Sequence, residues 1–169
     1  MAKSVGKIFE QNFKNSIPDN IFYYRPPDAA QSFGNNQNLR FSAKSPCDCF
    51  MFDGDFLYAF ELKSVGTKSI SYEISKDDKA IIHKHQIDNL KKFSIYKNII
   101  SGFILDFRLS EKTYFCPITQ FTYMTANLNK KSFHEKDLFE WCNPIDIEKK
   151  KLKVNYKYNI IKFLEDIKA

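Results

Sequence analysis

The chain has 169 residues, enough for one domain with a sizeable hydrophobic core. Hydrophobic residues make up 43% of the sequence and aromatic residues 16%, a content that excludes a disordered chain. Lysine and arginine outnumber aspartate and glutamate 26 to 20, giving a net charge of +6. This charge favours a polyanionic partner such as nucleic acid or an anionic membrane, and a basic protein without such a partner is the alternative.

Neither a secretory signal nor a membrane span is expected. Lys3 and Lys7 interrupt any apolar run at the start, and no stretch approaches the length of a membrane helix. The four cysteines include no CxxC pair and only three histidines are present, which argues against a structural zinc site. We therefore expect a cytoplasmic protein with reduced thiols and no membrane partner.

The first elements are a helix, a short strand and a loop. Hydrophobic residues at helical spacing predict an amphipathic helix over residues 4–15, which Pro18 ends. A short β-prone run follows at residues 21–24. Residues 26–45 show no apolar period and contain clustered glycine, asparagine and glutamine, which predicts a polar protruding loop.

A β-hairpin is predicted next. Two β-prone runs, at residues 47–52 and 56–63, are separated by Asp53-Gly54, a typical hairpin turn signal. The second run is almost continuously apolar up to Glu61, as expected of a strand near the centre of a sheet.

The second half of the chain is predicted to contain, in order, a helix, two strands and three helices, at residues 79–96, 99–107, 113–118, 118–127, 134–142 and 157–167. A basic run at residues 149–153 precedes the last helix. We interpret it as a solvated helix boundary, with DNA contact as the alternative. This order predicts a single domain over residues 1–169, an α/β or α+β sandwich with a mixed central sheet.

Two acids and a lysine are predicted to meet on this hairpin. Glu61 and Lys63 are two apart on a strand and so share a face, while Leu62 points into the core. If the turn at Asp53-Gly54 sets the register, Asp48 lies opposite Glu61, where Cβ atoms are about 4.5–5.5 Å apart. Paired carboxylates suit Mg²⁺, and an ammonium beside them can neutralise developing charge, which is sufficient for phosphodiester hydrolysis. The alternative is a surface Glu–Lys pair beside an unrelated aspartate.

Pro46-Cys47-Asp48, followed after a short hairpin by Glu61-Leu62-Lys63, resembles the PD-(D/E)xK nuclease motif. Further segments are similar to the RecU-type Holliday junction resolvases and their bacteriophage relatives, at residues 6–10, 24–28, 61–64 and 83–87. The similarity extends over about residues 4–140. It implies a restriction-endonuclease-like three-layer α/β fold, with a mixed central sheet flanked by helices.

The resemblance also implies roles for individual residues. Asp48 and Glu61 would bind Mg²⁺, with Mn²⁺ as the alternative, and Lys63 would steady the reaction centre. Gln86 would reach the metal site, through water, from the start of its helix; a helix-surface amide is the alternative. Glu10 would be a fourth catalytic residue that leans over the site, or else a charge in an i,i+4 pair on a solvated helix face.

The family further implies a homodimer that nicks two symmetric strands of a four-way DNA junction, because paired incisions need paired sites. Such an enzyme acts in recombination and repair or resolves phage DNA, in the cytoplasm of a bacterium or a phage-infected cell. Its DNA contacts are expected to be mainly to phosphates. The candidates are basic residues that flank the site, each of which also fits an ordinary solvated charge: Arg25, Arg40, Lys44 and Lys68.

Two features depart from the resolvase pattern. Pro46 stands where these enzymes usually carry a threonine, so a hydroxyl near the metal is missing. The polar loop at residues 26–45 is shorter than the protruding stalk with which the family engages junctions. Two alternatives therefore stay open: a PD-(D/E)xK nuclease with another DNA substrate in repair or restriction, and a junction-binding module that does not cut. A basic scaffold protein without a nucleic-acid role is a third.

Overall fold

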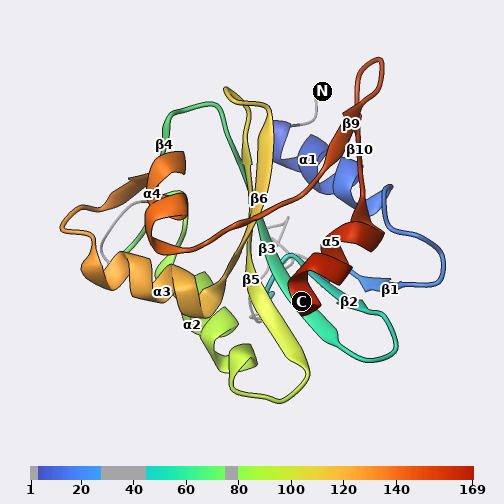
Figure 1. The fold of residues 1–169 in the computed structure, drawn as a ribbon, viewed down its shortest axis with the longest axis horizontal. Helices are drawn as coiled ribbons and strands as arrows, with labels where there is room; N and C mark the ends of the chain where they lie inside the picture. The colour runs from blue at the N-terminus through green and yellow to red at the C-terminus, as the bar shows by residue number, and fades with distance from the viewer. Residues whose placement is uncertain (1–3, 28–44, 75–79) are drawn as a thin grey trace, which may run out of the picture.

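A six-stranded mixed sheet forms the centre of the structure, a computed structural model that describes residues 4–27, 45–74 and 80–169 (Figure 1). Its strands lie in the order β1 (Phe22–Tyr24), β2 (Cys49–Phe52), β3 (Leu57–Val65), β5 (Ile99–Phe107), β6 (Lys112–Pro117) and β8 (Ile145–Asp146). β3 and β5 are parallel, and the other neighbouring pairs are antiparallel. Two small sheets pair β4 (Ser69–Ser71) with β7 (Ser132–His134), and β9 (Lys149–Lys151) with β10 (Tyr156–Tyr158).

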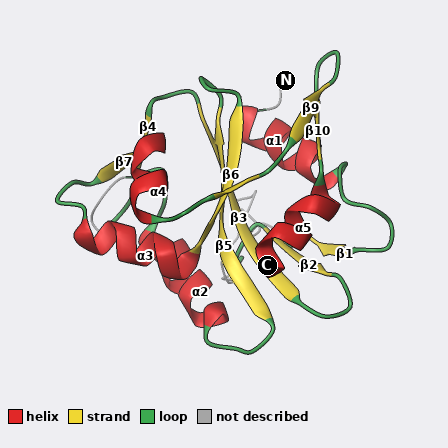
Figure 2. Ribbon diagram, viewed as in Figure 1, coloured by secondary structure: helices red, strands yellow, loops and turns green. Residues whose placement is uncertain are grey.

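Helices cover both faces of the central sheet, so the molecule has three layers (Figures 1 and 2). One face carries α2 (Lys84–Ser94), α3 (Ile118–Asn127) and α4 (Glu135–Trp141). The other carries α1 (Val5–Lys14), α5 (Ile160–Lys168) and the β9–β10 hairpin. This arrangement confirms the mixed central sheet flanked by helices that the sequence predicted.

The apolar run of β3 is explained by its position between two hydrophobic cores. Tyr58, Phe60 and Leu62 pack on the side of α1 and α5, whereas Ala59 packs on the side of α2 and α3. A strand covered on both faces needs apolar residues at successive positions rather than at alternate ones. Glu61 is two residues after Ala59 and so faces the same side of the sheet, where it is buried with 3% exposure.

α2 differs from its prediction at the start. It begins at Lys84 rather than near residue 79, because Ile82 is held in extended backbone by a parallel bridge to Tyr72. His83 then forms the N-cap of the helix.

The basic run is the main correction to the predicted elements. Residues 149–151 are not a helix boundary but strand β9, and the last helix begins at Ile160 rather than at residue 157. The two lysines at alternate positions, Lys149 and Lys151, face carboxylates. The run therefore has the two-residue period of a strand, which the identity of three successive lysines conceals. The short strands β4 and β7 were not predicted either.

The predicted polar loop at residues 26–45 falls largely on residues 28–44, outside the described part of the chain. Within the described ranges, no helix is both long enough and apolar enough to cross a bilayer.

Candidate active site

The turn of the β2–β3 hairpin sets the register of the site. The Asp53 carboxylate accepts hydrogen bonds from the backbone N–H groups of Asp55 at 3.0 Å and Phe56 at 2.9 Å. Gly54 has φ of 105°, a left-handed conformation that glycine adopts without steric cost. The local chemistry of these residues therefore fixes where the chain reverses and which residues of β2 and β3 face each other.

Asp48 lies beside Glu61 as a result. Cys49, the first residue of β2, pairs with Phe60, and Asp48 directly precedes it, outside the strand, with its charge close enough to raise the pKa of Glu61. The Asp48 backbone N–H donates to the Phe60 carbonyl at 3.1 Å, and the Asp48 carboxylate accepts from the Leu62 backbone N–H at 2.8 Å. Backbone contacts with β3 thus hold the aspartate against the strand that carries Glu61.

Glu61 receives two side-chain hydrogen bonds in its buried position. The Lys63 ammonium donates to Glu61 Oε1 at 3.1 Å, and the two residues share a face because they are two apart on β3. The side-chain N–H of Gln86, in the first turn of α2, donates to the same oxygen. Gln86 Oε1 in turn accepts from the His83 backbone N–H at 2.9 Å, so the helix cap orients the amide with its nitrogen toward Glu61.

Burial and the charge of Asp48 raise the pKa of Glu61 to about 7, against the lowering effect of Lys63. When Asp48 and Glu61 are both ionised, their two negative charges exceed the single positive charge of Lys63. Such a carboxylate pair fits a hard divalent cation such as Mg²⁺. Protein-bound Mg²⁺ is usually coordinated by one or two carboxylates, and water and substrate oxygens fill its other coordination positions. Among the described residues, no group of three or more His, Cys, Asp or Glu side chains is placed to hold a metal ion.

Glu10 approaches this cluster from α1. Its carboxylate forms an ion pair with Arg25 at 3.2 Å, while Lys14, the expected i,i+4 partner, lies over the ring of Tyr23. Burial raises the pKa of the Cys49 thiol, and the charges of Asp48, Glu61 and Glu10 raise it further. The charge of Glu10 therefore acts on the same Cys49 thiol as the charges of Asp48 and Glu61.

The two predicted DNA contacts that the structure describes, Arg25 and Lys68, lie in different surroundings. Arg25 lies beside Glu10 in the ion pair described above. Lys68 is exposed, beyond the end of β3, where its carbonyl oxygen lies 3.1 Å from a ring nitrogen of His134 rather than near the carboxylates. Arg40 and Lys44 lie outside the described residues.

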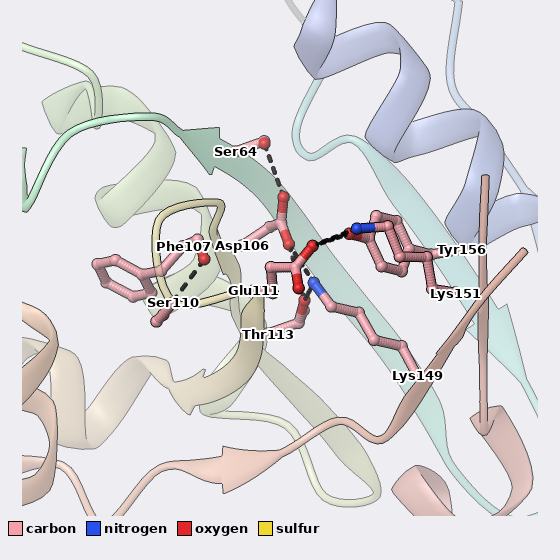
Figure 3. Close-up of polar contacts among 9 residues, drawn as sticks. All are labelled: Ser64, Asp106, Phe107, Ser110, Glu111, Thr113, Lys149, Lys151 and Tyr156. Carbon is pink, nitrogen blue, oxygen red and sulfur yellow. Dashed lines mark hydrogen bonds and ion pairs between the residues drawn. The ribbon is translucent and has the colours of Figure 1, made fainter. Parts of the chain in front are cut away.

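A polar cluster around Asp106 was missed by the sequence reasoning (Figure 3). Asp106 is buried and is bonded to Ser64, Thr113 and Lys149, just beyond Lys63 along the sheet. One signal in the sequence points to it: Asp106 is the single charged residue within the apolar strand at residues 99–107. An isolated acid in a buried strand needs a partner.

The architecture has three layers, a mixed central sheet with helices on both faces. No family model matches the sequence. The chain is 34% identical over 178 aligned positions to the SPbeta prophage-derived uncharacterized protein YotM of Bacillus subtilis (strain 168), an alignment that covers 98% of this chain and 88% of that protein. The chain therefore belongs to the YotM family. Among solved structures it is similar to Hjc of Archaeoglobus fulgidus, a Holliday junction resolvase from an archaeal hyperthermophile, with a TM-score of 0.47 and 15% identity over 75% of this chain and 83% of that one.

Proposed function

We propose that the chain is a metal-dependent DNA endonuclease of the PD-(D/E)xK type that resolves four-way junctions, as the RecU-type resolvases do. The observation that carries the proposal is the β2–β3 hairpin, which holds the Asp48 carboxylate against the Leu62 N–H, next to Glu61, with Lys63 bonded to Glu61. Two acids and an ammonium brought together on the central sheet are the groups that phosphodiester hydrolysis requires.

Asp48 and Glu61 would hold Mg²⁺, or Mn²⁺ in its place. When bound, the ion supplies a Lewis acid for a phosphoryl oxygen and lowers the pKa of a water molecule. The Leu62 N–H fixes the Asp48 carboxylate, and Gln86 fixes that of Glu61, so both ligands are oriented in advance. Gln86 would act through Glu61 or through a bound water rather than as an oxygen ligand, because its own oxygen accepts from His83.

Lys63 would neutralise negative charge that develops on the phosphate. Its hydrogen bond to Glu61 and its low exposure, 16% for the side chain, fix the ammonium next to the acids. Glu10 would complete the catalytic set from α1, with Arg25 as its partner and as a contact to DNA. The remaining proposed DNA contacts are Arg40, Lys44 and Lys68.

A homodimer is part of the proposal, because two symmetric nicks in one junction need two sites related by a two-fold axis. The prophage origin of the YotM relative supports a role in phage recombination or in resolving phage DNA in the cytoplasm of the host.

A cleavage assay tests the proposal. The parent protein, Asp48→Ala and Glu61→Ala are incubated with a synthetic four-way junction and Mg²⁺, alongside linear, nicked and flap duplexes. We expect each substitution to lower the cleavage rate by about 10²–10³-fold, the usual effect of losing a group that stabilises the transition state. Asp55→Ala is the matched control, because Asp55 is an exposed acid of the same hairpin and lies in its turn, away from Glu61.

Three results would count against parts of the proposal. If Asp48→Ala cuts as fast as the parent, the site is misplaced. If all the duplexes are cut equally well, the nuclease stands and the junction selectivity fails. Tight, salt-dependent junction binding without any metal-dependent incision would instead identify a module that binds and does not cut.

A further inference from the structure

The β9–β10 hairpin extends past α1 at one end of the central sheet (Figure 1). Its register pairs Lys149 with Tyr158, Lys150 with Lys157 and Lys151 with Tyr156. Because side chains alternate along a strand, Lys149 and Lys151 belong to one face of this hairpin, and the Lys150–Lys157 pair belongs to the other. We call these the inner face and the outer face of the hairpin.

The inner face is anchored to the central sheet by a buried ion pair (Figure 3). The Lys149 ammonium donates to Asp106 at 2.8 Å and to the Thr113 hydroxyl at 2.9 Å, and its side chain is 8% exposed. Asp106 also accepts from the Ser64 hydroxyl at 2.8 Å and from Thr113 at 2.9 Å. This network fixes where the hairpin leaves the sheet.

The second inner lysine is neutralised as well. Lys151 forms an ion pair with Glu111 at 2.7 Å, and the Tyr156 hydroxyl donates to the same carboxylate at 2.7 Å. The inner face therefore has one carboxylate for each lysine.

The outer face has no such compensation. Lys150 and Lys157 are directly opposite each other and exposed, and neither forms an ion pair with any residue that the structure describes. Like charges opposite each other destabilise a β-ladder, so this pair costs stability unless an anion binds it. The exposed Lys153 adds a further positive charge in the turn that follows β9.

A pocket of about 370 Å³ borders the outer lysines, lined by Glu148, Lys149, Lys150, Lys157, Tyr158 and Asn159. The single acid of this lining, Glu148, is already paired with Lys162. The pocket therefore presents net positive charge, as a phosphate-binding surface requires.

The hairpin is anchored close to the candidate active site along the sheet, but on the α1 face, whereas the side chains of Glu61 and Lys63 lie on the α2 face. Its anchor, Asp106, is opposite Ser64 in the β3–β5 register, and Ser64 directly follows Lys63. At about 3.3 Å per strand residue, Ser64 is about 10 Å along β3 from Glu61. The hairpin also packs on α1, the helix that carries Glu10, through ring contacts of Tyr158 with Phe9 and Phe13.

We propose that the outer face of the β9–β10 hairpin binds the phosphate backbone of the duplex arm that leads into the active site. The inference rests on DNA being the substrate, as proposed above. Lysine ammonium groups act as point charges toward phosphates and carry no base specificity, so this face would add affinity and orientation without sequence preference. An anionic lipid surface is the competing ligand, and the contact of the hairpin with α1, the helix that carries Glu10, favours DNA.

The test compares Lys150→Gln/Lys157→Gln with Lys91→Gln/Lys92→Gln in the full chain. Lys91 and Lys92 are exposed lysines in the last turn of α2, so the control makes the same change in net charge elsewhere. Binding to a synthetic four-way junction and to a linear duplex is measured in EDTA over a series of salt concentrations. Without divalent metal the readout is binding alone, and it is independent of whether the protein cuts.

Two phosphate contacts contribute about 1.8 to the slope of log K against log salt concentration. We therefore expect the outer-face variant to lose about that much slope, which is about 60-fold in affinity at 0.1 M salt if the curves meet at 1 M. The control is expected to keep the parent slope. Thermal unfolding of the outer-face variant at or above the parent midpoint checks that it is folded, because a repulsive pair has been removed.

A parent-like slope for Lys150→Gln/Lys157→Gln overturns the inference, even if Asp48-dependent cleavage is found. A lost slope without any cleavage keeps the inference and rejects the nuclease proposal. Unchanged DNA affinity together with loss of binding to phosphatidylserine vesicles would assign the outer face to lipid and also overturn it.

Discussion

Replacing Asp48 by asparagine is expected to stabilise the metal-free protein at alkaline pH while abolishing cleavage. The substitution removes the negative charge beside Glu61 and keeps a side-chain oxygen that can accept the 2.8 Å hydrogen bond from the Leu62 N–H. The hairpin contact is thus retained, and the repulsion between the two acids is lost.

The size of the effect follows from the pKa of Glu61, which rises from 4.5 to about 7. A shift of this size corresponds to about 3 kcal/mol between the two protonation states. Because the folded pKa is above the unfolded one, the parent has this stability below about pH 4.5 and loses it as the pH rises through about 7. Burial is the first cause and the charge of Asp48 the second, so we assign about 1 kcal/mol of the loss to Asp48.

Urea unfolding in EDTA at pH 5 and pH 8 measures the difference. Asp48→Asn is expected to exceed the parent by about 1 kcal/mol at pH 8 and to match it at pH 5, where Glu61 is mostly protonated in the folded state. Asp55→Asn serves as the control and is expected to show no pH-dependent gain. A variant less stable than the parent at pH 8, or equally shifted at both pH values, would refute the argument that the acids repel each other.

Two further predictions concern the groups around the site. Lys149→Met leaves Asp106 buried without its cation, and urea unfolding is expected to show a loss of about 3–5 kcal/mol, whereas a loss below 1 kcal/mol would mean that the pair is not buried in solution. Gln86→Ala removes a hydrogen bond to Glu61, and we expect cleavage to require about 10-fold more Mg²⁺ at an unchanged maximal rate. An unchanged Mg²⁺ requirement would show that Gln86 does not orient Glu61.

The sequence was sufficient for the elements whose pattern is set locally. The Asp53-Gly54 turn, with its hydrogen bonds within the loop, determines the register of β2 and β3, and this is why the approach of Asp48 to the Glu61–Leu62 part of β3 could be derived. The helix over residues 118–127 was predicted at its observed bounds because an apolar stripe directly follows Pro117.

Other features depend on partners that are distant in the chain. β9 was missed because successive lysines show no apolar–polar alternation in the sequence. Lys149 and Lys151 differ from Lys150 only in their contacts, and the partner carboxylates, Asp106 and Glu111, are about 40 residues away in the chain. The pairing of Glu10 with Arg25 likewise requires the placement of α1 against β1. Local periodicity gives no information about such contacts.

In the proposed active site, Asp48 and Glu61 bind one cation between them. Anomalous scattering from a crystal of the protein grown or soaked with Mn²⁺ measures this directly. We expect one strong peak within coordination distance of both carboxylates, and its loss in Asp48→Ala. A peak elsewhere, or none at a Mn²⁺ concentration that supports cleavage, would contradict it.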